Sequence, residues 1–191
     1  MSYVIRPMRE EDLPQAAAIE KICFTSEAWS EKVYREEFER SANRAGADPS
    51  IEKKDALPRE ATVDRLFLCS CAYLWLWAAA DEVDDTRVLG AISLTRVGDD
   101  GEIGNVAVLP KFRRQGIARK LLTEAIRFGE REQNLQAFTL EVRAGNAAAI
   151  RLYEAAGFHE EGRRPRFYTE PVEDALIMWR RKERETKGHR P

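Results

Sequence analysis

The chain has 191 residues, of which 43% are hydrophobic and 34% are charged. This length allows one full hydrophobic core and is short for two ordinary domains, so we expect a single domain. The 31 Lys and Arg residues nearly balance the 33 Asp and Glu residues, and the net charge is only -2. No overall basic field favours nucleic-acid binding, so any anion-binding site must be local.

The cysteines and histidines do not indicate a metal site. Cys69 and Cys71 would share one face of an extended strand, and with Cys23 they are interpreted as ordinary thiols in a reducing compartment. The two histidines, His159 and His189, have no cysteine or carboxylate partner at metal-ligand spacing. We therefore expect no metal.

The hydropathy pattern favours a protein without a membrane span. Residues 1–7 lack a basic region followed by an apolar core, so no export signal is expected. The longest apolar stretch, at 66–80, is too short to cross a bilayer as a helix and is interpreted as a buried strand. A soluble, cytoplasmic protein is the expectation.

Periodic apolar positions predict two helices near the start of the chain. A short strand at 3–8 precedes a helix with an acidic first turn at 10–12, where negative charge suits the helix dipole. The apolar side of this helix comprises Leu13, Ala16, Ile19 and Cys23. The second helix should begin after Ser30, whose hydroxyl suits an N-cap. Its apolar side comprises Val33, Tyr34 and Phe38.

The middle of the chain changes character twice. Residues 41–64 combine turn formers and charges without periodicity, which predicts a long surface loop or a partly disordered insertion. Apolar runs then predict strands at 66–79, 88–97 and 103–109. The turn-rich segment 81–85 suits an antiparallel hairpin between the first two, and Pro110, which has no N–H to donate, ends the third.

The remaining segments alternate between helix and strand. An amphipathic helix is expected from Gly116, followed by a strand at 138–142. Asn146 should cap a short helix that buries Ile150 and Tyr153 and ends at Gly157. Two strands near 158–162 and 175–179 complete a domain over residues 1–180, and residues 181–191 form a charged, flexible tail. This order predicts a mixed α/β sandwich.

The most informative segment is 111–120, Lys-Phe-Arg-Arg-Gln-Gly-Ile-Ala-Arg-Lys, where five cations and no acid surround a glycine at a strand-to-helix turn. Free backbone N–H groups and the positive helix end converge there, and Gly116 allows an anion to approach closely. We interpret the segment as a pyrophosphate cradle, and an ordinary solvated helix start is the alternative. The chain lacks both the P-loop and the Gly-x-Gly-x-x-Gly signatures, which argues against nucleotide hydrolysis and dinucleotide binding.

Three segments together resemble a known family. Arg-x-x-Gly-x-Ala at 113–118, following Asn-Val-Ala-Val-Leu-Pro at 105–110, is similar to the acetyl-CoA motif of the GNAT superfamily of N-acetyltransferases. Residues 140–158 resemble the ribosomal-protein-alanine N-acetyltransferase (RimI-like) branch, and residues 166–178 resemble the C-terminal hairpin of protein N-terminal acetyltransferases. The resemblance implies a mixed, mostly antiparallel central sheet with helices on both faces. It leaves out the 41–64 insertion and the tail.

The resemblance implies acetyl-CoA as the cofactor. In that family the strand corresponding to 105–108 splays from its neighbour, so that free N–H groups of Val106, Ala107 and Val108 would meet the pantetheine and the thioester carbonyl. The other implied cofactor-binding residues are Arg113, Arg114, Gln115, Gly116, Ile117, Ala118, Arg119 and Asn146.

Two residues are implied to be catalytic. Glu141 alternates with Leu140 and Val142, so its side chain points to the opposite face of its strand. The resemblance makes it the general base that deprotonates the acceptor amine, directly or through water, and a solvent-facing carboxylate is the alternative. Tyr153, about two helical turns after Asn146, is implied to protonate the leaving thiolate. An ordinary core tyrosine is the alternative.

The acceptor site is implied to comprise Phe24, Trp29 and Tyr168. The loop at 24–30 departs from the Phe-Pro-Trp-Ser pattern of related enzymes by Thr25 and by extra residues before Trp29. Phe24 and Trp29 are alternatively core aromatics. The leading expectation is acetylation of a protein N-terminus, with a ribosomal protein beginning in alanine or serine as one candidate. The alternatives are acetylation of a lysine side chain or small-molecule amine, and a non-catalytic acetyl-CoA-binding module.

Overall fold

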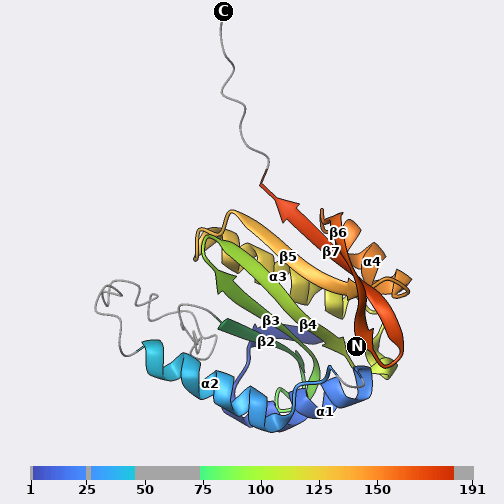
Figure 1. Cartoon of the computed structure of the whole chain (residues 1–191). Helices are drawn as coiled ribbons and strands as arrows, with labels where there is room; N and C mark the ends of the chain where they lie inside the picture. Colours follow the sequence, from blue (N-terminus) through green and yellow to red (C-terminus); the bar gives the residue numbers. More distant parts are fainter. Residues whose placement is uncertain (1, 25–26, 46–73, 183–191) are drawn as a thin grey trace, which may run out of the picture.

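The computed structural model describes residues 2–24, 27–45 and 74–182. Within these ranges, seven strands form one sheet in the order β1-β2-β3-β4-β5-β7-β6, and all neighbours except β4 and β5 are antiparallel (Figure 1). The elements are β1 (Tyr3–Pro7), α1 (Leu13–Cys23), α2 (Glu31–Ala45), β2 (Leu74–Asp81), β3 (Val88–Val97), β4 (Asp100–Val108), α3 (Ile117–Arg131), β5 (Ala137–Arg143), α4 (Ala147–Glu154), β6 (His159–Thr169) and β7 (Val172–Arg181). Their order along the chain is the one that the sequence predicts.

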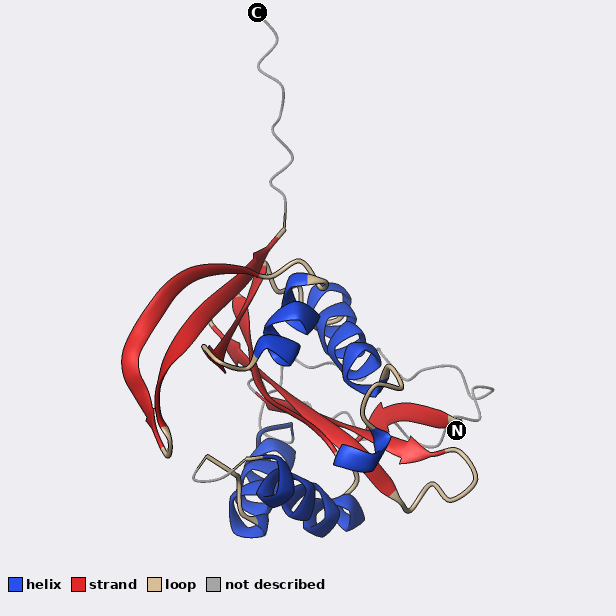
Figure 2. Ribbon diagram, turned by 90° about the vertical axis from the view of Figure 1, so that its right-hand side faces the viewer, coloured by secondary structure: helices blue, strands red, loops and turns tan. Residues whose placement is uncertain are grey.

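Helices cover both faces of the sheet (Figure 2). α3 and α4 pack on one face, over a core that includes Trp77, Leu89, Ile92, Leu121, Phe138 and Tyr153. α1 and α2 pack on the other face, over a second core that includes Leu13, Ala16, Tyr34, Phe38 and Leu76. Leu76 and Trp77 lie in different cores because successive side chains of a strand point to opposite faces. The mixed, mostly antiparallel sandwich expected from the sequence is confirmed.

The sheet is split between β4 and β5. These strands pair in parallel over only three positions, which join Asp100–Glu102 to Ala137–Thr139. Beyond this point β4 stays paired with β3 up to Val108, whereas β5 stays paired with β7 up to Arg143. The two strands diverge (Figure 1), so the facing edges of both are open toward the carboxyl end of β4.

The last two strands are longer than the sequence predicts, because β6 and β7 extend well beyond 158–162 and 175–179. The register of β6 shifts between Arg164 and Tyr168, around Pro165, which has no N–H for a ladder. An edge strand tolerates such a proline. The long hairpin curves away from the rest of the sheet (Figure 2) and brings its tip toward the side of the molecule that carries α1 and α2.

Several expectations near the insertion and the tail change. α2 continues to Ala45, so the start of the expected 41–64 loop is helical, and Val33 is 36% exposed instead of facing the core. Residues 46–64 lie outside the described residues, as do 66–73 with Cys69 and Cys71, and 183–191 with His189. Arg181, assigned to the tail by the sequence, is the last residue of β7.

A buried carboxylate on α1 fixes Trp29, just before the start of α2. Glu20 is 1% exposed and accepts hydrogen bonds from the Trp29 N–H (2.6 Å), the Tyr34 hydroxyl (2.6 Å) and Asn105 Nδ2 (2.9 Å). Burial raises the pKa of Glu20, and the hydrogen bonds from Tyr34, Trp29 and Asn105 oppose that rise. Ser30 caps α2 as predicted, because its Oγ accepts from the Val33 N–H (3.3 Å). Glu20 therefore links α1, Trp29, α2 and β4.

Replacing Glu20 by Gln should lower the free energy of unfolding by about 1–3 kcal/mol, because one acceptor oxygen becomes an NH₂ group that faces a donor. The pKa of Glu20 is higher in the folded than in the unfolded state. Its contribution to stability is therefore complete below the unfolded pKa and is lost as the pH rises through the folded pKa. The stability difference between wild type and Glu20→Gln, measured by urea unfolding at about pH 4 and at about pH 7, should be smaller at the higher pH.

The control for this prediction is Glu124→Gln, which changes an exposed carboxylate on α3 that pairs with Arg127. Its effect on the free energy of unfolding should stay within about 0.5 kcal/mol at both pH values. A Glu20→Gln difference that widens toward neutral pH would contradict the direction of the shift.

Candidate active site

Two adjoining cavities lie where β4 and β5 separate. The first, of about 390 Å³, lies between the end of β4, the turn before α3, and α4. The second, of about 260 Å³, lies between β4, β5 and the tip of the β6–β7 hairpin. The residues that line both are Cys23, Phe24, Val106, Asn146, Ala149 and Tyr153. The two cavities are therefore two arms of one site, and Tyr153 stands at their junction.

The open edge of β4 presents backbone donors to this site. The Leu109 N–H donates to the Leu89 carbonyl of β3 (3.0 Å), and alternation along the strand directs the N–H of Ala107 to β3 as well. The N–H groups of Val106 and Val108 therefore point away from β3, toward the opening. The Val108 carbonyl confirms this direction, because it accepts from Arg113 Nε at 3.0 Å.

The turn before α3 supplies a basic rim to the first cavity. Gly116 has a φ of 82° and precedes the first residue of the 15-residue helix, so the free N–H groups of the first helical turn face outward. The predicted residues that line the cavity here are Arg113, Arg114, Gly116, Ile117, Ala118 and Arg119. Gln115 does not line it, because Gln115 lies toward β1, where its carbonyl accepts from the Tyr3 hydroxyl at 3.2 Å.

α4 contributes two predicted residues to the junction. Asn146 caps this helix, because its Oδ1 accepts from the Ala149 N–H at 3.2 Å. Tyr153 is 7% exposed and its ring packs edge-to-face on Phe158. Burial, and to a smaller extent the neighbouring Tyr168, raises the pKa of Tyr153, so the phenol keeps its proton at neutral pH.

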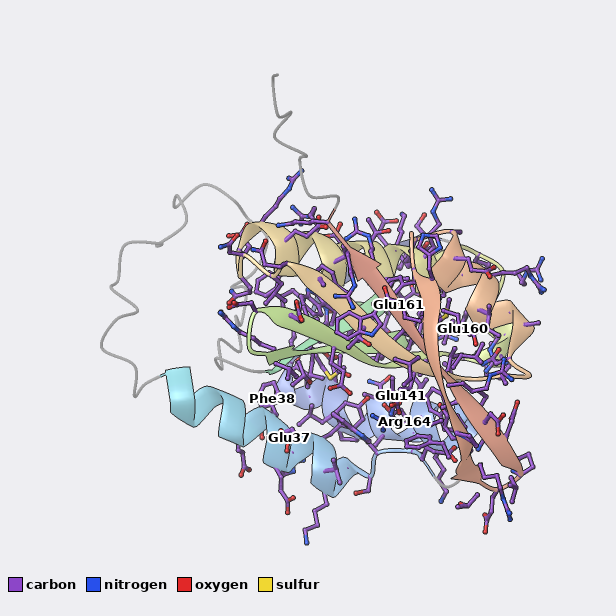
Figure 3. All side chains as sticks on the ribbon, turned by 45° about the horizontal axis from the view of Figure 1, so that its top comes forward. Glu37, Phe38, Glu141, Glu160, Glu161 and Arg164 are labelled. Carbon is purple, nitrogen blue, oxygen red and sulfur yellow. The ribbon has the colours of Figure 1, made fainter. Side chains whose placement is uncertain are left out.

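The second cavity contains the predicted carboxylate. The Glu141 side chain is 27% exposed, and its Oε1 pairs with Arg164 Nη1 of the edge strand β6 at 3.0 Å (Figure 3). Tyr168 lines the same cavity, and the guanidinium of Arg143 lies 4.1 Å from the centre of its ring. Burial and the nearby Glu141 raise the pKa of Tyr168, whereas Arg143 lowers it.

Besides Gln115, two predicted residues lie outside both cavities. Ala107 is buried between β3 and α1, where it packs with Ile19 and Val88, and its N–H is directed to β3. Trp29 packs against the core under α1 and α2, with its ring 5.4 Å from that of Tyr34, as the core-aromatic alternative expects. Phe24 of the same loop does line both cavities.

The cavities also include residues that were not among the predicted site residues. Asn105 and Arg143 carried a signal: Asn105 is polar within an otherwise apolar segment, and Arg143 shares the face of Glu141 by alternation. Glu27 lies in the loop 24–30 that the resemblance implies for the acceptor, although only Phe24 and Trp29 of that loop were predicted to bind it. Cys23 carried no signal, because it reaches the site from the end of α1. Among the described residues, no group of three or more His, Cys, Asp or Glu side chains is arranged to hold a metal ion. No helix in the described ranges is long and apolar enough to cross a membrane.

Comparison with known proteins places this architecture. The model of the acetyltransferase (GNAT) family matches residues 15–158. The ribosomal protein bS18-alanine N-acetyltransferase of Escherichia coli (strain K12) is 43% identical over 93 residues, which cover 47% of this chain and 62% of that protein. The chain thus spans less than two thirds of the length of this curated relative.

Solved structures extend the likeness to nearly the whole chain. The ribosomal-protein-S18-alanine N-acetyltransferase from Escherichia coli superposes with a TM-score of 0.69 at 26% identity, covering 97% of this chain and 98% of that one. The NatC complex bound to Gag peptide and CoA gives a TM-score of 0.69 at 23% identity, covering 95% of this chain and 99% of that one, and so shares the fold. With a family match over more than half of its length, the chain belongs to the acetyltransferase (GNAT) family.

Proposed function

We propose that this chain transfers an acetyl group from acetyl-CoA to the N-terminal α-amine of a protein. The observation that carries the proposal is the position of Tyr153, at the junction of a cavity with a basic rim and free N–H groups and a cavity that contains Glu141. The names of the relatives support the acceptor: one acts on a ribosomal protein alanine, and a structural neighbour holds a peptide and CoA. A ribosomal protein beginning with alanine or serine is one candidate.

The first cavity fits acetyl-CoA, which supplies the activated acyl group. The turn at Gly116, with the side chains of Arg114 and Arg119, would bind the pyrophosphate through backbone N–H groups and positive charge. The N–H groups of Val106 and Val108 would hold the pantetheine arm and the thioester carbonyl. Donors fixed at that carbonyl interact more strongly as negative charge develops on its oxygen, which lowers the barrier.

In the second cavity Glu141 would accept a proton from the acceptor's ammonium group, directly or through one water molecule. The freed nitrogen then bonds to the acyl carbon while the carbon–sulfur bond breaks and the sulfur leaves as a thiolate. The second proton that the nitrogen loses on becoming an amide passes to that sulfur, which completes free CoA. Arg164 already places a cation at this carboxylate, so the position suits positive charge. An acceptor ammonium would join Arg164 there or replace it.

Tyr153 would stabilise the departing sulfur. An ordinary thiol has a pKa of about 8.5, which lies below the pKa of an ordinary tyrosine, about 10. Burial raises the pKa of Tyr153, so the phenol is protonated and has a hydrogen to donate when the sulfur leaves. We propose that the phenol donates a hydrogen bond to the thiolate until the second proton from the nitrogen neutralises the sulfur, directly or through the phenol, which is the acid role that the family resemblance implies.

The proposed function is tested by incubating the chain with acetyl-CoA and peptides that differ in their first two residues. Peptides with a free α-amine should be acetylated there, and the same peptides with a blocked N-terminus should not react, as read by mass spectrometry. Acetylation confined to lysine side chains or small amines would overturn the proposed acceptor. Tight binding of acetyl-CoA without turnover on any amine would overturn transfer itself.

Replacing Glu141 by Gln should lower kcat about 10²–10⁴-fold, because the amide cannot accept the ammonium proton. The dissociation constant for acetyl-CoA should stay unchanged, since Glu141 lines the acceptor cavity and not the first. The matched control is Glu160→Gln, which removes an exposed carboxylate of β6 that pairs with Arg163 outside both cavities. Steady-state kinetics and calorimetry measure both quantities, and a kcat equal to that of Glu160→Gln would remove Glu141 as the base.

A further inference from the structure

Arg143 connects the two walls of the acceptor cavity. It is the last residue of β5, two positions after Glu141, and its side chain is 20% exposed. One wall is the β6–β7 hairpin, which carries Tyr168. The other wall contains Phe24, directly after α1, and Glu27.

On the hairpin side the guanidinium makes four contacts. Nη1 donates to the Pro171 carbonyl (3.0 Å) and pairs with Glu173 Oε2 (3.2 Å), and Nη2 donates to the Glu170 carbonyl (3.1 Å). The same group lies over the ring of Tyr168 at 4.1 Å. A planar group with several fixed donors suits this arrangement, and a lysine ammonium could not reproduce it.

On the loop side Arg143 Nη2 pairs with Glu27 Oε1 at 2.7 Å. Glu27 belongs to the residues by which this loop exceeds the Phe-Pro-Trp-Ser pattern of related enzymes, so the connection uses a feature of this chain. Glu27 and Glu173 are 29% and 24% exposed, and one guanidinium lies between their carboxylates. Without that cation, partly buried acids on opposite walls would repel each other.

We propose that Arg143 is a positioning residue that sets the separation of the two acceptor-cavity walls and thereby the choice of the acceptor's first residue. The inference rests on the proposed function, because the second cavity must be the acceptor site. Arg143 does not take part in the chemistry: it holds Tyr168 and the Glu27 side of the cavity at a fixed spacing beside Glu141.

The test compares Arg143→Gln, Arg143→Lys and Glu27→Gln with wild type in the acetylation of peptides that begin with a small or a large residue. Arg143→Gln should raise the KM for the preferred peptide about tenfold or more, because displaced walls misplace the acceptor. The KM for acetyl-CoA should stay within about twofold of wild type, since Arg143 does not line the first cavity. The preference between small and large first residues should move toward one.

Arg143→Lys should lie between Arg143→Gln and wild type, and Glu27→Gln should change peptide KM and preference in the same direction by a smaller factor. The control is Arg127→Gln, which breaks an exposed arginine–glutamate pair on α3 away from both cavities and should leave all constants unchanged. If Arg143→Gln does not fold, Glu27→Gln alone decides the question. The inference is overturned if the folded variants keep the wild-type peptide KM and preference, or if the KM for acetyl-CoA rises in parallel.

These outcomes are separate from a failure of the proposed function, which appears in the wild type as lack of α-amine acetylation. Should wild type acetylate a different amine, the same variants are compared with that acceptor, and an unchanged KM for it overturns the role of Arg143.

Discussion

The separation of β4 and β5 is the constraint on which the site depends. Backbone N–H groups that are removed from water without a partner cost free energy, so a strand edge seldom faces the inside of a protein. Here the edge of β4 turns the N–H groups of Val106 and Val108 into a cavity, where a ligand can pair with them. The same divergence leaves room for α4 to bring Asn146 and Tyr153 between the strands. The backbone N–H donors, the Tyr153 phenol and the Glu141 carboxylate lie together because β4 and β5 pair at only three positions and then separate.

The site has an electrical polarity that the net charge of -2 conceals. The first cavity is bordered by Arg113, Arg114 and Arg119, whereas the second is lined by Glu27, Glu141 and Glu170 together with Arg143. Arg164 pairs with Glu141 from the edge strand β6 and leaves the acids in excess. A phosphate-bearing donor and an ammonium-bearing acceptor are thus attracted to different arms. Complementary charge of this kind speeds encounter and selects orientation more than it adds affinity. The polarity also disfavours the reverse arrangement, because it would place phosphates beside carboxylates.

Local chemistry explains which features the sequence could predict. The caps at Ser30 and Asn146, and the alternation that places Glu141, depend on residues close in the chain, and the sequence predicts them correctly. The side of β4 that faces β3 depends on register, which is fixed by a pairing partner, so Ala107 was grouped with its neighbours although its N–H points to β3. The roles of Trp29 and Glu27 also depend on tertiary contacts that the sequence does not show. The Trp29 N–H is held by Glu20 outside the cavities, whereas Glu27 pairs with Arg143, which lies over a hundred positions away in the chain.

The residues that the two cavities share have a thermodynamic consequence. Phe24, Asn146 and Tyr153 belong to both linings, so a molecule in one cavity becomes part of the wall of the other. Binding of donor and acceptor is then linked by a coupling free energy, and linkage is reciprocal. If bound acetyl-CoA changes the affinity for the acceptor by some factor, the bound acceptor changes the affinity for acetyl-CoA by the same factor. Affinity for each ligand is therefore a property of the ternary complex, and a value measured with one ligand alone describes only the first step of its assembly.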